Sequence, residues 1–381
     1  MARLLFVVND AGYFLSHRLP IAQAAQNAGF EVHVAAPDES KRGVFQAYGF
    51  LYHHWPVTRS GWNPFIEIAL IWKLVRIFGH LKPDILHLVT MKPVLYGGIA
   101  ARFTGIVKVV AAVTGLGFVF SGNGVMSNTL RFLVSGLYRV ALSQLGPCVI
   151  FQNIDDIKII SRLAKLKPEN IYLIRGVGVD LAEYGISTLP STTSMPIVVL
   201  AARLLKTKGV PEFVEAARML RERGLKARFV LVGLPDKKNP ESIDEGFIAG
   251  YVKDGIIEHW GHRNDMPEVF RQSSLVVLPS YREGMPKVLL EAAASGRAVV
   301  TADAPGCREA IVPGVTGLLV PPRDAGALAD ALEQLLNDRG RLEAMGKAGR
   351  ELAEREFDVL GVAERHLEIY RRIAASDQPK G

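Results

Sequence analysis

The sequence predicts an α/β protein with two Rossmann-like domains that face each other across a cleft. Three observations point to this fold class: the length of the chain, the alternation of short apolar runs with amphipathic segments, and a polar stretch between two such series. At 381 residues the chain is longer than one hydrophobic core usually supports, so two domains are expected.

Short apolar runs that alternate with helical patterns are typical of parallel strands joined by crossover helices. Ligands bind at the carboxyl ends of such strands, so functional residues are expected on the loops that follow them. The expected strands are residues 4–8, 31–35, 85–88 and 107–113 in the first series, and residues 197–201, 229–232, 275–279 and 298–301 in the second.

The polar stretch at residues 187–194, rich in Ser and Thr, is the best candidate for a linker. It separates an N-terminal domain of residues 1–186 from a C-terminal domain of residues 187–357. Residues 358–381 are expected to form a helix that crosses back to the N-terminal domain.

The composition, 49% hydrophobic and 22% charged, excludes a disordered chain. Two cysteines provide neither a disulfide framework nor a metal-ligand spacing, which fits a reducing cytoplasm. No uncharged apolar run reaches the length of about 18 residues that a bilayer-spanning helix needs. We therefore expect a cytoplasmic protein that is soluble or associated peripherally with the inner face of the cell membrane.

The net charge of +7 is unevenly distributed along the chain. Residues 1–175 contain 18 Lys and Arg against 9 Asp and Glu, whereas the remaining residues contain 27 against 29. The basic half predicts an anionic partner, which is a phospholipid surface, a nucleic acid or a phosphorylated acceptor.

Two glutamates, Glu283 and Glu291, stand eight positions apart where a strand passes through a turn into a helix. At a rise of about 1.5 Å per residue they lie roughly 12 Å apart near one face, comparable with the distance from the sugar to the ribose of a nucleotide sugar. Glutamates are usually solvated, but the small apolar residues around Glu291 argue against an outer face. The helix N-terminus offers amides to a diphosphate. Donor contacts are expected from Glu283, Gly284, Met285, Pro286, Lys287, Val288 and Glu291.

Arg203 and Lys208 follow the expected strand at residues 197–201. A departing nucleoside diphosphate develops negative charge, which either a divalent metal or fixed cations must neutralise. Because the sequence contains no Asp-x-Asp pair, we expect these two cations to act in catalysis and expect no metal or other cofactor. Taken singly, each is also compatible with an ordinary surface charge. Arg263, in a turn before the expected helix cap Asp265, is a further donor candidate.

These motifs resemble the nucleotide-binding half of glycosyltransferase family 4, whose members have the two-domain GT-B fold. The resemblance extends over nearly the whole chain and implies a retaining, metal-independent transfer from a nucleotide sugar. It implies that Arg203 and Lys208 bind the diphosphate, that Glu283 contacts the transferred sugar, and that Glu291 contacts the ribose. Whether a covalent intermediate forms stays open; our hypothesis is attack on the face of the leaving group, with the departing phosphate as base. The resemblance rests on Arg203, Lys208, the Gly-x-Arg-x-Asp turn at Gly261, Glu283, Glu291 and Gly306.

Residues of the N-terminal half are expected to bind the acceptor. A polar, glycine-bearing loop at residues 9–20 follows the first strand; Gly12 allows close approach to the donor phosphates, and Asn9 and His17 are acceptor candidates. Lys92 follows another strand as a candidate phosphate cation. Many relatives carry a histidine after the strand at residues 109–113, whereas this chain offers only Thr114, so that role does not transfer directly.

The segments around His17, Lys92 and residues 114–117, with residues 176–180 and 236–240, are similar to those of bacterial transferases that extend undecaprenyl-diphosphate-linked sugars. This resemblance implies a UDP-linked N-acetylhexosamine donor and a lipid-diphosphate-linked glycan acceptor. A UDP-sugar 2-epimerase on the same architecture is the alternative, although its acid and base residues have no counterparts here. No recognised motif supports a nucleic-acid partner.

Two segments combine apolar residues with charges that are mostly basic, which is typical of helices that lie in an anionic headgroup layer. They span residues 64–83 and 130–142. Packing on the first sheet explains most of their apolar side chains, but we also expect this domain to bind an anionic membrane surface.

Overall fold

The computed structural model describes residues 1–58, 63–116, 125–143, 148–191, 193–237 and 239–375. The chain forms two compact units. The first combines Met1–Val177 with Leu360–Gly381, and the second is Gly178–Val359. The predicted α/β class with two parallel sheets is confirmed.

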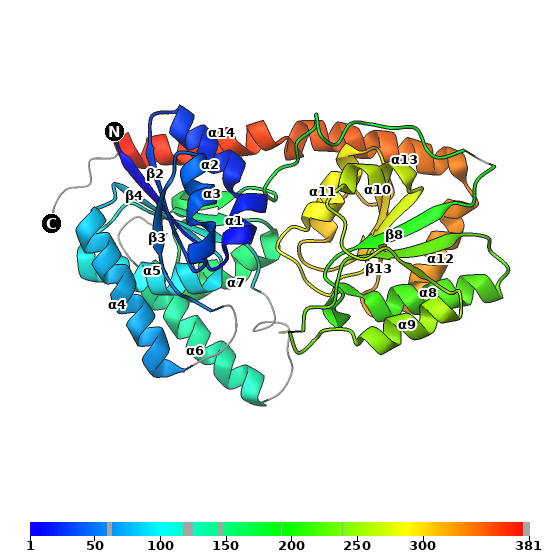
Figure 1. Cartoon of the computed structure of the whole chain (residues 1–381), viewed down its shortest axis with the longest axis horizontal. Helices are drawn as coiled ribbons and strands as arrows, with labels where there is room; N and C mark the ends of the chain where they lie inside the picture. The colour runs from blue at the N-terminus through cyan, green and yellow to red at the C-terminus, as the bar shows by residue number, and fades with distance from the viewer. Residues whose placement is uncertain (59–62, 117–124, 144–147, 192, 238, 376–381) are drawn as a thin grey trace. The chain divides into compact units, whose positions relative to one another are not determined.

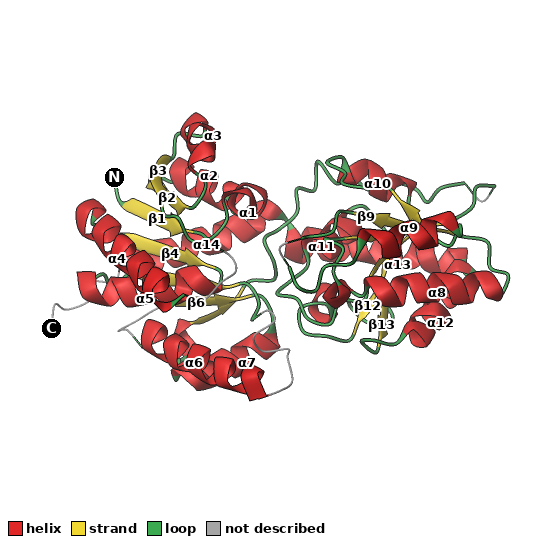
Figure 2. Cartoon of the chain, turned by 60° about the horizontal axis from the view of Figure 1, so that its bottom comes forward, coloured by secondary structure: helices red, strands yellow, loops and turns green. Residues whose placement is uncertain are grey.

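The first unit is built on a seven-stranded parallel sheet with the order β3-β2-β1-β4-β5-β6-β7 (Figure 2). Parallel pairing sets Leu4 of β1 beside Val32 on one side and Ile85 on the other. The strands are β1 (Arg3–Val7), β2 (Glu31–Ala36), β3 (Leu51–His54), β4 (Ile85–Val89), β5 (Val109–Val113), β6 (Cys148–Phe151) and β7 (Ile171–Leu173).

Helices cover both faces of this sheet, because side chains alternate between the faces along each strand. Leu4 and Phe6 pack under one helical layer, and Leu5 and Val7 pack under the other. The first layer contains α1 (Ala11–His17), α2 (Leu19–Asn27), α3 (Arg42–Ala47) and α14 (Val359–Ala375); the second contains α4 (Pro64–Leu81), α5 (Met91–Thr104), α6 (Val125–Leu142) and α7 (Ile154–Ala164).

Helix α14 belongs to the first unit although it ends the chain (Figure 1). Its residues Tyr370 and Ile373 are buried in the same core cluster as Phe6 and Ile21. The Tyr370 hydroxyl also hydrogen-bonds to His87 Nδ1 inside this core. The expected return of the C-terminal helix is therefore visible in the contacts of α14, and the first unit is discontinuous in sequence.

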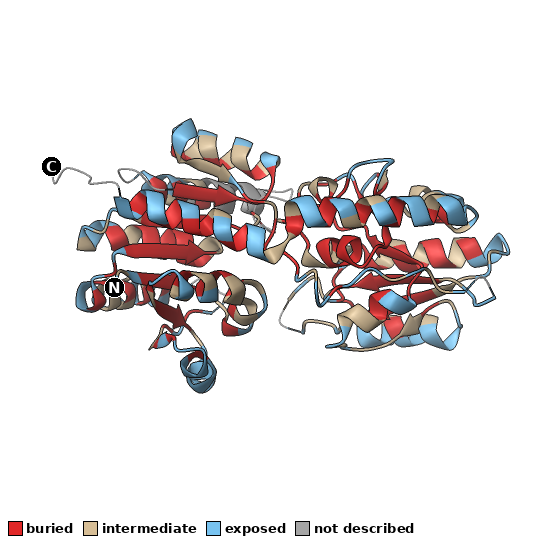
Figure 3. Ribbon diagram, turned by 90° about the horizontal axis from the view of Figure 1, so that it is seen from above, coloured by how far each residue is buried: buried red, intermediate tan, exposed pale blue. Residues whose placement is uncertain are grey.

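The second unit has a six-stranded parallel sheet with the order β10-β9-β8-β11-β12-β13. Most residues of its strands are buried, whereas most of its helices combine buried residues with exposed or half-buried ones (Figure 3). The strands are β8 (Ile197–Ala201), β9 (Arg228–Val232), β10 (Glu258–His259), β11 (Leu275–Leu278), β12 (Ala298–Ala302) and β13 (Gly317–Val320), and the α-helices are α8 (Val210–Glu222), α9 (Glu245–Lys253), α10 (Met266–Gln272), α11 (Lys287–Ala294), α12 (Ala325–Leu336) and α13 (Arg339–Leu352).

The polar stretch at residues 187–194, expected to be a linker, lies within the second unit, as do residues 178–186. Arg297, which is fully buried, holds this stretch to the sheet. Its guanidinium donates to the Ser187 carbonyl at 2.7 Å and to the Phe270 carbonyl at 2.8 Å. Burial lowers the pKa of Arg297 to about 10. The boundary thus falls between 177 and 178 rather than between 186 and 187, because hydrogen bonds fasten the polar stretch.

The two predicted membrane segments differ in their exposure. In α4, Phe65 and Trp72 are exposed, whereas Leu74 and Phe78 are buried in the core. In α6, Tyr138 and Leu142 are buried as well, so packing on the sheet explains them. The side chains of the expected apolar residues 130–133 lie outside the described part of the chain.

Replacing Arg297 by Met should lower the free energy of unfolding by about 3 kcal/mol, because buried carbonyls then lose their donor. Urea titration measures this change. Arg339 provides a matched control, since it donates to the Pro190 carbonyl at 2.9 Å from an exposed position. Arg339→Met should cost less than about 1 kcal/mol. An equal decrease in the free energy of unfolding in the two variants would contradict the inference that Arg297 fastens residues 187–194 to the rest of the second unit.

Candidate functional site

Most of the predicted donor residues lie on loops at the carboxyl edge of the second sheet. Arg203 follows β8, Arg263 follows β10, and Glu283 follows β11, while α11 carries Glu291. Parallel pairing of β8 with β9 and β11 brings these loops to one edge. The strand order changes direction between β8 and β11, which is where sheets of this kind bind ligands.

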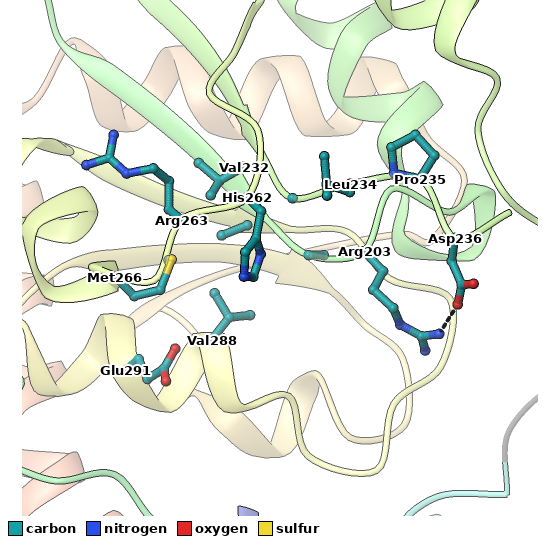
Figure 4. A pocket seen from close by; sticks show the side chains of 13 residues that line it. Arg203, Val232, Leu234, Pro235, Asp236, His262, Arg263, Met266, Val288 and Glu291 are labelled. Atoms are coloured by element: carbon teal, nitrogen blue, oxygen red, sulfur yellow. Dashed lines mark hydrogen bonds and ion pairs between the residues drawn. The ribbon is translucent and has the colours of Figure 1, made fainter. Parts of the chain in front are cut away.

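A pocket of about 480 Å³ lies at this edge (Figure 4). Its lining residues come from the ends of β8 and β9, the loops after β8, β9 and β10, the start of α10, and helix α11. Four predicted donor residues, Arg203, Arg263, Val288 and Glu291, are among them. The lining consists of Ala201, Ala202, Arg203, Val232, Gly233, Leu234, Pro235, Asp236, His262, Arg263, Met266, Val288 and Glu291.

Glu291 is a nearly buried carboxylate on the wall of this pocket, with 6% of its surface exposed. Its Oε1 atom accepts a hydrogen bond from the Tyr184 hydroxyl at 2.9 Å and lies 3.1 Å from Lys287 Nζ. Burial raises the pKa of Glu291, while Lys287 and the Tyr184 hydroxyl oppose this effect. The site thus keeps a poorly solvated acceptor facing a cavity.

Lys208 and Glu283, predicted separately, form an ion pair with each other. Both side chains are mostly buried, with 19% and 13% exposed. Gly306 supports this arrangement, because its φ is +83° and a Cβ there would lie 2.4 Å from the Glu283 carbonyl oxygen. The Glu283 amide donates to the Pro305 carbonyl at 2.9 Å. The loops after β11 and β12 therefore hold the Glu283 backbone in place.

The two pocket arginines also have acidic neighbours. Arg203 pairs with Asp236 at 2.8 Å, and Arg263 Nε donates to Asp265 at 2.7 Å. Arg263 also lies over the Trp260 ring, 5.7 Å from its centroid. Asp265 stands at the N-cap position of α10 as expected, but its side chain makes no cap hydrogen bond and pairs with Arg263 instead. These contacts orient both guanidinium groups in the unliganded protein.

Helix α11 begins at Lys287, with Pro286 as a cap residue that makes no side-chain cap hydrogen bond. Its first backbone amides therefore have no side-chain acceptor within the helix cap. Gly284 and Met285 precede it in the loop, and Met285 is buried in the core cluster that contains Leu289. This start of α11 fits the predicted diphosphate contact, which stays a prediction.

Sequence reasoning missed several residues around the pocket. Tyr184 is distant from Glu291 in sequence, so no local pattern indicates their hydrogen bond. In the sequence, Asp236 stands only in a segment similar to that of a subfamily, and nothing there indicates its ion pair with Arg203. His262 and Met266 line the pocket from the turn and helix that follow β10. Position after a strand is the one signal that could have pointed to them.

In the first unit, the candidate acceptor residues follow strands β1, β4 and β5. Asn9 precedes α1, whose cap Asp10 accepts from the Tyr13 amide at 2.6 Å. The expected loop at residues 9–20 is therefore wrong beyond Asp10, because this cap starts a helix that includes Gly12 and His17. His17 stacks on Tyr13 with ring centroids 4.3 Å apart. Thr114 follows β5 and is partly buried.

Lys92, expected to be a phosphate cation, is only 5% exposed. Its ammonium lies 2.8 Å from Glu67 on α4, so its charge is balanced inside the unit. Thr90, two residues before Lys92, has φ of 76° and ψ of 171°, a strained conformation for a residue other than glycine. The loop after β4, which the sequence already indicates through Lys92, thus also carries backbone strain of the kind found at functional sites.

Comparison with known proteins agrees with this architecture. Residues 3–146 match the family described as glycosyl transferase 4-like, and residues 195–338 match glycosyl transferases group 1. The chain is 30% identical to N,N'-diacetylbacillosaminyl-diphospho-undecaprenol alpha-1,3-N-acetylgalactosaminyltransferase of Campylobacter jejuni, over 96% of this chain and 98% of the relative. It is 25% identical to the capsular polysaccharide biosynthesis glycosyltransferase CapM of Staphylococcus aureus, over 48% of each chain.

Solved structures share the fold. The sucrose-phosphate synthase of Thermosynechococcus elongatus superposes with a TM-score of 0.81 at 20% identity, over 99% of this chain and 100% of that chain. HepE of Anabaena, solved in complex with UDP, gives a TM-score of 0.75 at 18% identity, over 98% of this chain and 100% of that chain.

The fold and the sites at its strand ends thus define a GT-B glycosyltransferase. The chain belongs to the family of group 1 and 4-like glycosyltransferases, which confirms the predicted resemblance. The comparisons give no support to the UDP-sugar 2-epimerase alternative. Across the described residues, no helix is long and apolar enough to cross a membrane.

Because burial raises the pKa of Glu291, its ionised form costs stability in the unliganded protein, and the cost appears as pH rises above the ordinary carboxyl pKa of 4.5. Glu291→Gln should therefore unfold at a higher temperature than the wild type at about pH 7.5. The difference should shrink near pH 4.5, as measured by scanning calorimetry.

Glu258 provides a control of opposite sign, because a hydrogen bond from Arg228 lowers its pKa. Glu258→Gln should lose stability near pH 7.5, and this loss should fade as pH falls through the lowered pKa. A lower unfolding temperature of Glu291→Gln near pH 7.5 would contradict the cost assigned to the buried carboxylate.

Proposed function

We propose that this glycosyltransferase is retaining and metal-independent, and that it moves an N-acetylhexosamine from a UDP-sugar to a polyprenyl-diphosphate-linked saccharide in surface glycan synthesis. The observation that carries the donor assignment is the pocket of the second unit, where Arg203, Arg263 and the buried Glu291 meet beside the start of α11. The acceptor class is supported by the similarity to the Campylobacter transferase over nearly its whole length.

The donor contacts follow from the chemistry of each group. Glu291 accepts hydrogen bonds from the ribose hydroxyls. The amides at the start of α11 and the cations Arg203 and Lys208 face the diphosphate, where negative charge increases as the glycosidic bond breaks. Glu283 contacts the transferred sugar. Glu283 and Lys208 form an ion pair in the absence of substrate. A bound diphosphate competes with Glu283 for the Lys208 ammonium, so the Glu283 carboxylate becomes available to accept hydrogen bonds from sugar hydroxyls.

The proposed transfer takes place on one face of the sugar. The bond from the anomeric carbon to the UDP β-phosphate oxygen breaks while the acceptor hydroxyl oxygen bonds to the same face of that carbon. The departing β-phosphate oxygen takes the hydroxyl proton, so the products are the α-configured glycoside of an α-linked donor and UDP. Arg203 and Lys208 act on the leaving group by their fixed charge, and the proposal requires no metal.

The acceptor is assigned to the first unit, with Asn9, His17, Lys92 and Thr114 as proposed contacts. Of these, Lys92 binds only if the acceptor replaces or shares its partner Glu67. The basic excess of residues 1–175 suits a diphosphate-linked acceptor in an anionic membrane.

Helices α4 and α5 carry the surface that we propose binds the inner face of the cell membrane. Phe65 is 85% exposed, Trp72 is 53% exposed, and Phe103 of α5 is 66% exposed. The rings of Trp72 and Phe103 stack with centroids 5.6 Å apart. Exposed aromatic residues of this kind, with basic neighbours, favour binding at an anionic headgroup layer. The exposed basic neighbours are Arg76, Lys82 and Arg102.

A donor screen tests the reaction itself. The full chain is incubated with several UDP-sugars and a short-chain polyprenyl-diphosphate sugar, and products are read by mass spectrometry. We expect addition of one N-acetylhexosamine, unaffected by EDTA. Lys208→Ala should lower kcat by about 100-fold or more, because its charge acts mainly in the transition state. Loss of activity with EDTA and its recovery with Mg²⁺ or Mn²⁺ would contradict the role of the fixed cations.

Liposome sedimentation at low salt tests the membrane surface. The wild type should bind vesicles that contain anionic lipids, and Phe65→Ser with Trp72→Ser should weaken binding about tenfold or more. The matched control is Val44→Ser with Tyr48→Ser, two exposed residues at α3. Equal failure of the wild type with anionic and neutral vesicles would contradict membrane binding and leave the transferase assignment unaffected.

A further inference from the structure

The two contacts of Glu291 use the same oxygen. Tyr184 donates to Oε1, and the Lys287 ammonium also lies nearest to Oε1. No side chain among the residues described here makes a hydrogen bond or ion pair to Oε2. Because Glu291 lines the pocket, Oε2 is the atom available to a ligand.

Tyr184 is itself held in a fixed position. Tyr184 is 5% exposed, and its ring lies near that of Phe270, with centroids 6.1 Å apart. Arg350 donates to the Tyr184 carbonyl and to the Ala294 carbonyl, both at 2.8 Å. One guanidinium therefore joins the backbone of Tyr184 to the C-terminal end of α11, the helix that carries Glu291.

The turn before Tyr184 adds a second anchor. Asp180 Oδ1 accepts from the Ala182 amide at 2.9 Å, and the Tyr184 amide donates to the Asp180 carbonyl at 2.9 Å.

Burial raises the pKa of Tyr184, so its hydroxyl keeps its proton and acts as the donor.

We propose that Tyr184 is a positioning residue for the nucleotide: it holds Oε1 of Glu291 so that Oε2 is presented to the ribose hydroxyls. This inference rests on the proposed ribose contact of Glu291. Without the Tyr184 hydroxyl, the buried carboxylate loses a donor, becomes easier to protonate and is no longer held in one orientation.

Calorimetric titration of Tyr184→Phe with UDP and with 2′,3′-dideoxy-UDP tests the proposal. We expect affinity for UDP to fall about tenfold and affinity for the dideoxy nucleotide, which lacks both hydroxyls, to stay unchanged. In kinetics, KM for the donor should rise more than kcat falls, because the ribose contact is present before and during transfer. The pH below which UDP binding is lost should also move upward in the variant.

Tyr281→Phe is the matched control, since it removes a hydroxyl that donates to Glu212 at 2.6 Å in the same unit. It should leave the affinities for both nucleotides unchanged. An equal loss of both nucleotides in Tyr184→Phe would show a general structural effect and overturn the inference, as would no loss of either.

Glu291→Ala separates this inference from the proposed function. If it weakens UDP but not the dideoxy nucleotide while Tyr184→Phe does neither, the ribose contact stands and the positioning role is wrong. If Glu291→Ala affects both nucleotides equally, the ribose contact itself is wrong.

Discussion

Parallel strand pairing is the constraint on which both candidate sites depend. In a parallel sheet, the carboxyl ends of all strands lie at the same edge. Residues that follow different strands are therefore brought to that edge even when they are far apart in sequence. In the second unit the order reverses between β8 and β11, and in the first it reverses between β1 and β4. The cations after β8 and the glutamate after β11 flank one reversal; Asn9 and the strained Thr90 flank the other.

The buried charged side chains of the two units are stabilised by different kinds of partner. Lys208 with Glu283 and Lys92 with Glu67 are ion pairs with little exposure. Arg297 is balanced by backbone carbonyls instead, which suits a group that fastens a segment. Glu291 is left with one oxygen engaged, and this incomplete satisfaction is what a ligand with hydroxyl groups can complete. In the proposed function, the carboxylate that we expect to cost stability in the unliganded protein is the group that binds the nucleotide.

Much of the architecture could be predicted from the sequence, because hydrophobic periodicity and residues at strand ends are local signals. The positions of Arg203, Glu283 and Glu291 at the carboxyl edge of the second sheet could be predicted in this way. What could not be predicted depends on distant partners: Tyr184 beside Glu291, and Glu67 beside Lys92. The unit boundary was misplaced for the same reason, since a Ser- and Thr-rich stretch reads as a linker unless the buried arginine that binds it is known.

The return of α14 to the first unit has a consequence for how the chain folds. Residues that complete the first core, such as Tyr370 and Ile373, are synthesised after the whole of the second unit. The second unit is continuous in sequence, so all strands of its sheet are synthesised before α14. The core of the first unit cannot be completed until α14 has been synthesised. Until then, the apolar residues of β1 and α2 that share this core with α14 stay uncovered. A fragment that stops at Val177 keeps that surface exposed, whereas one that spans Gly178–Val359 contains every strand of its own sheet.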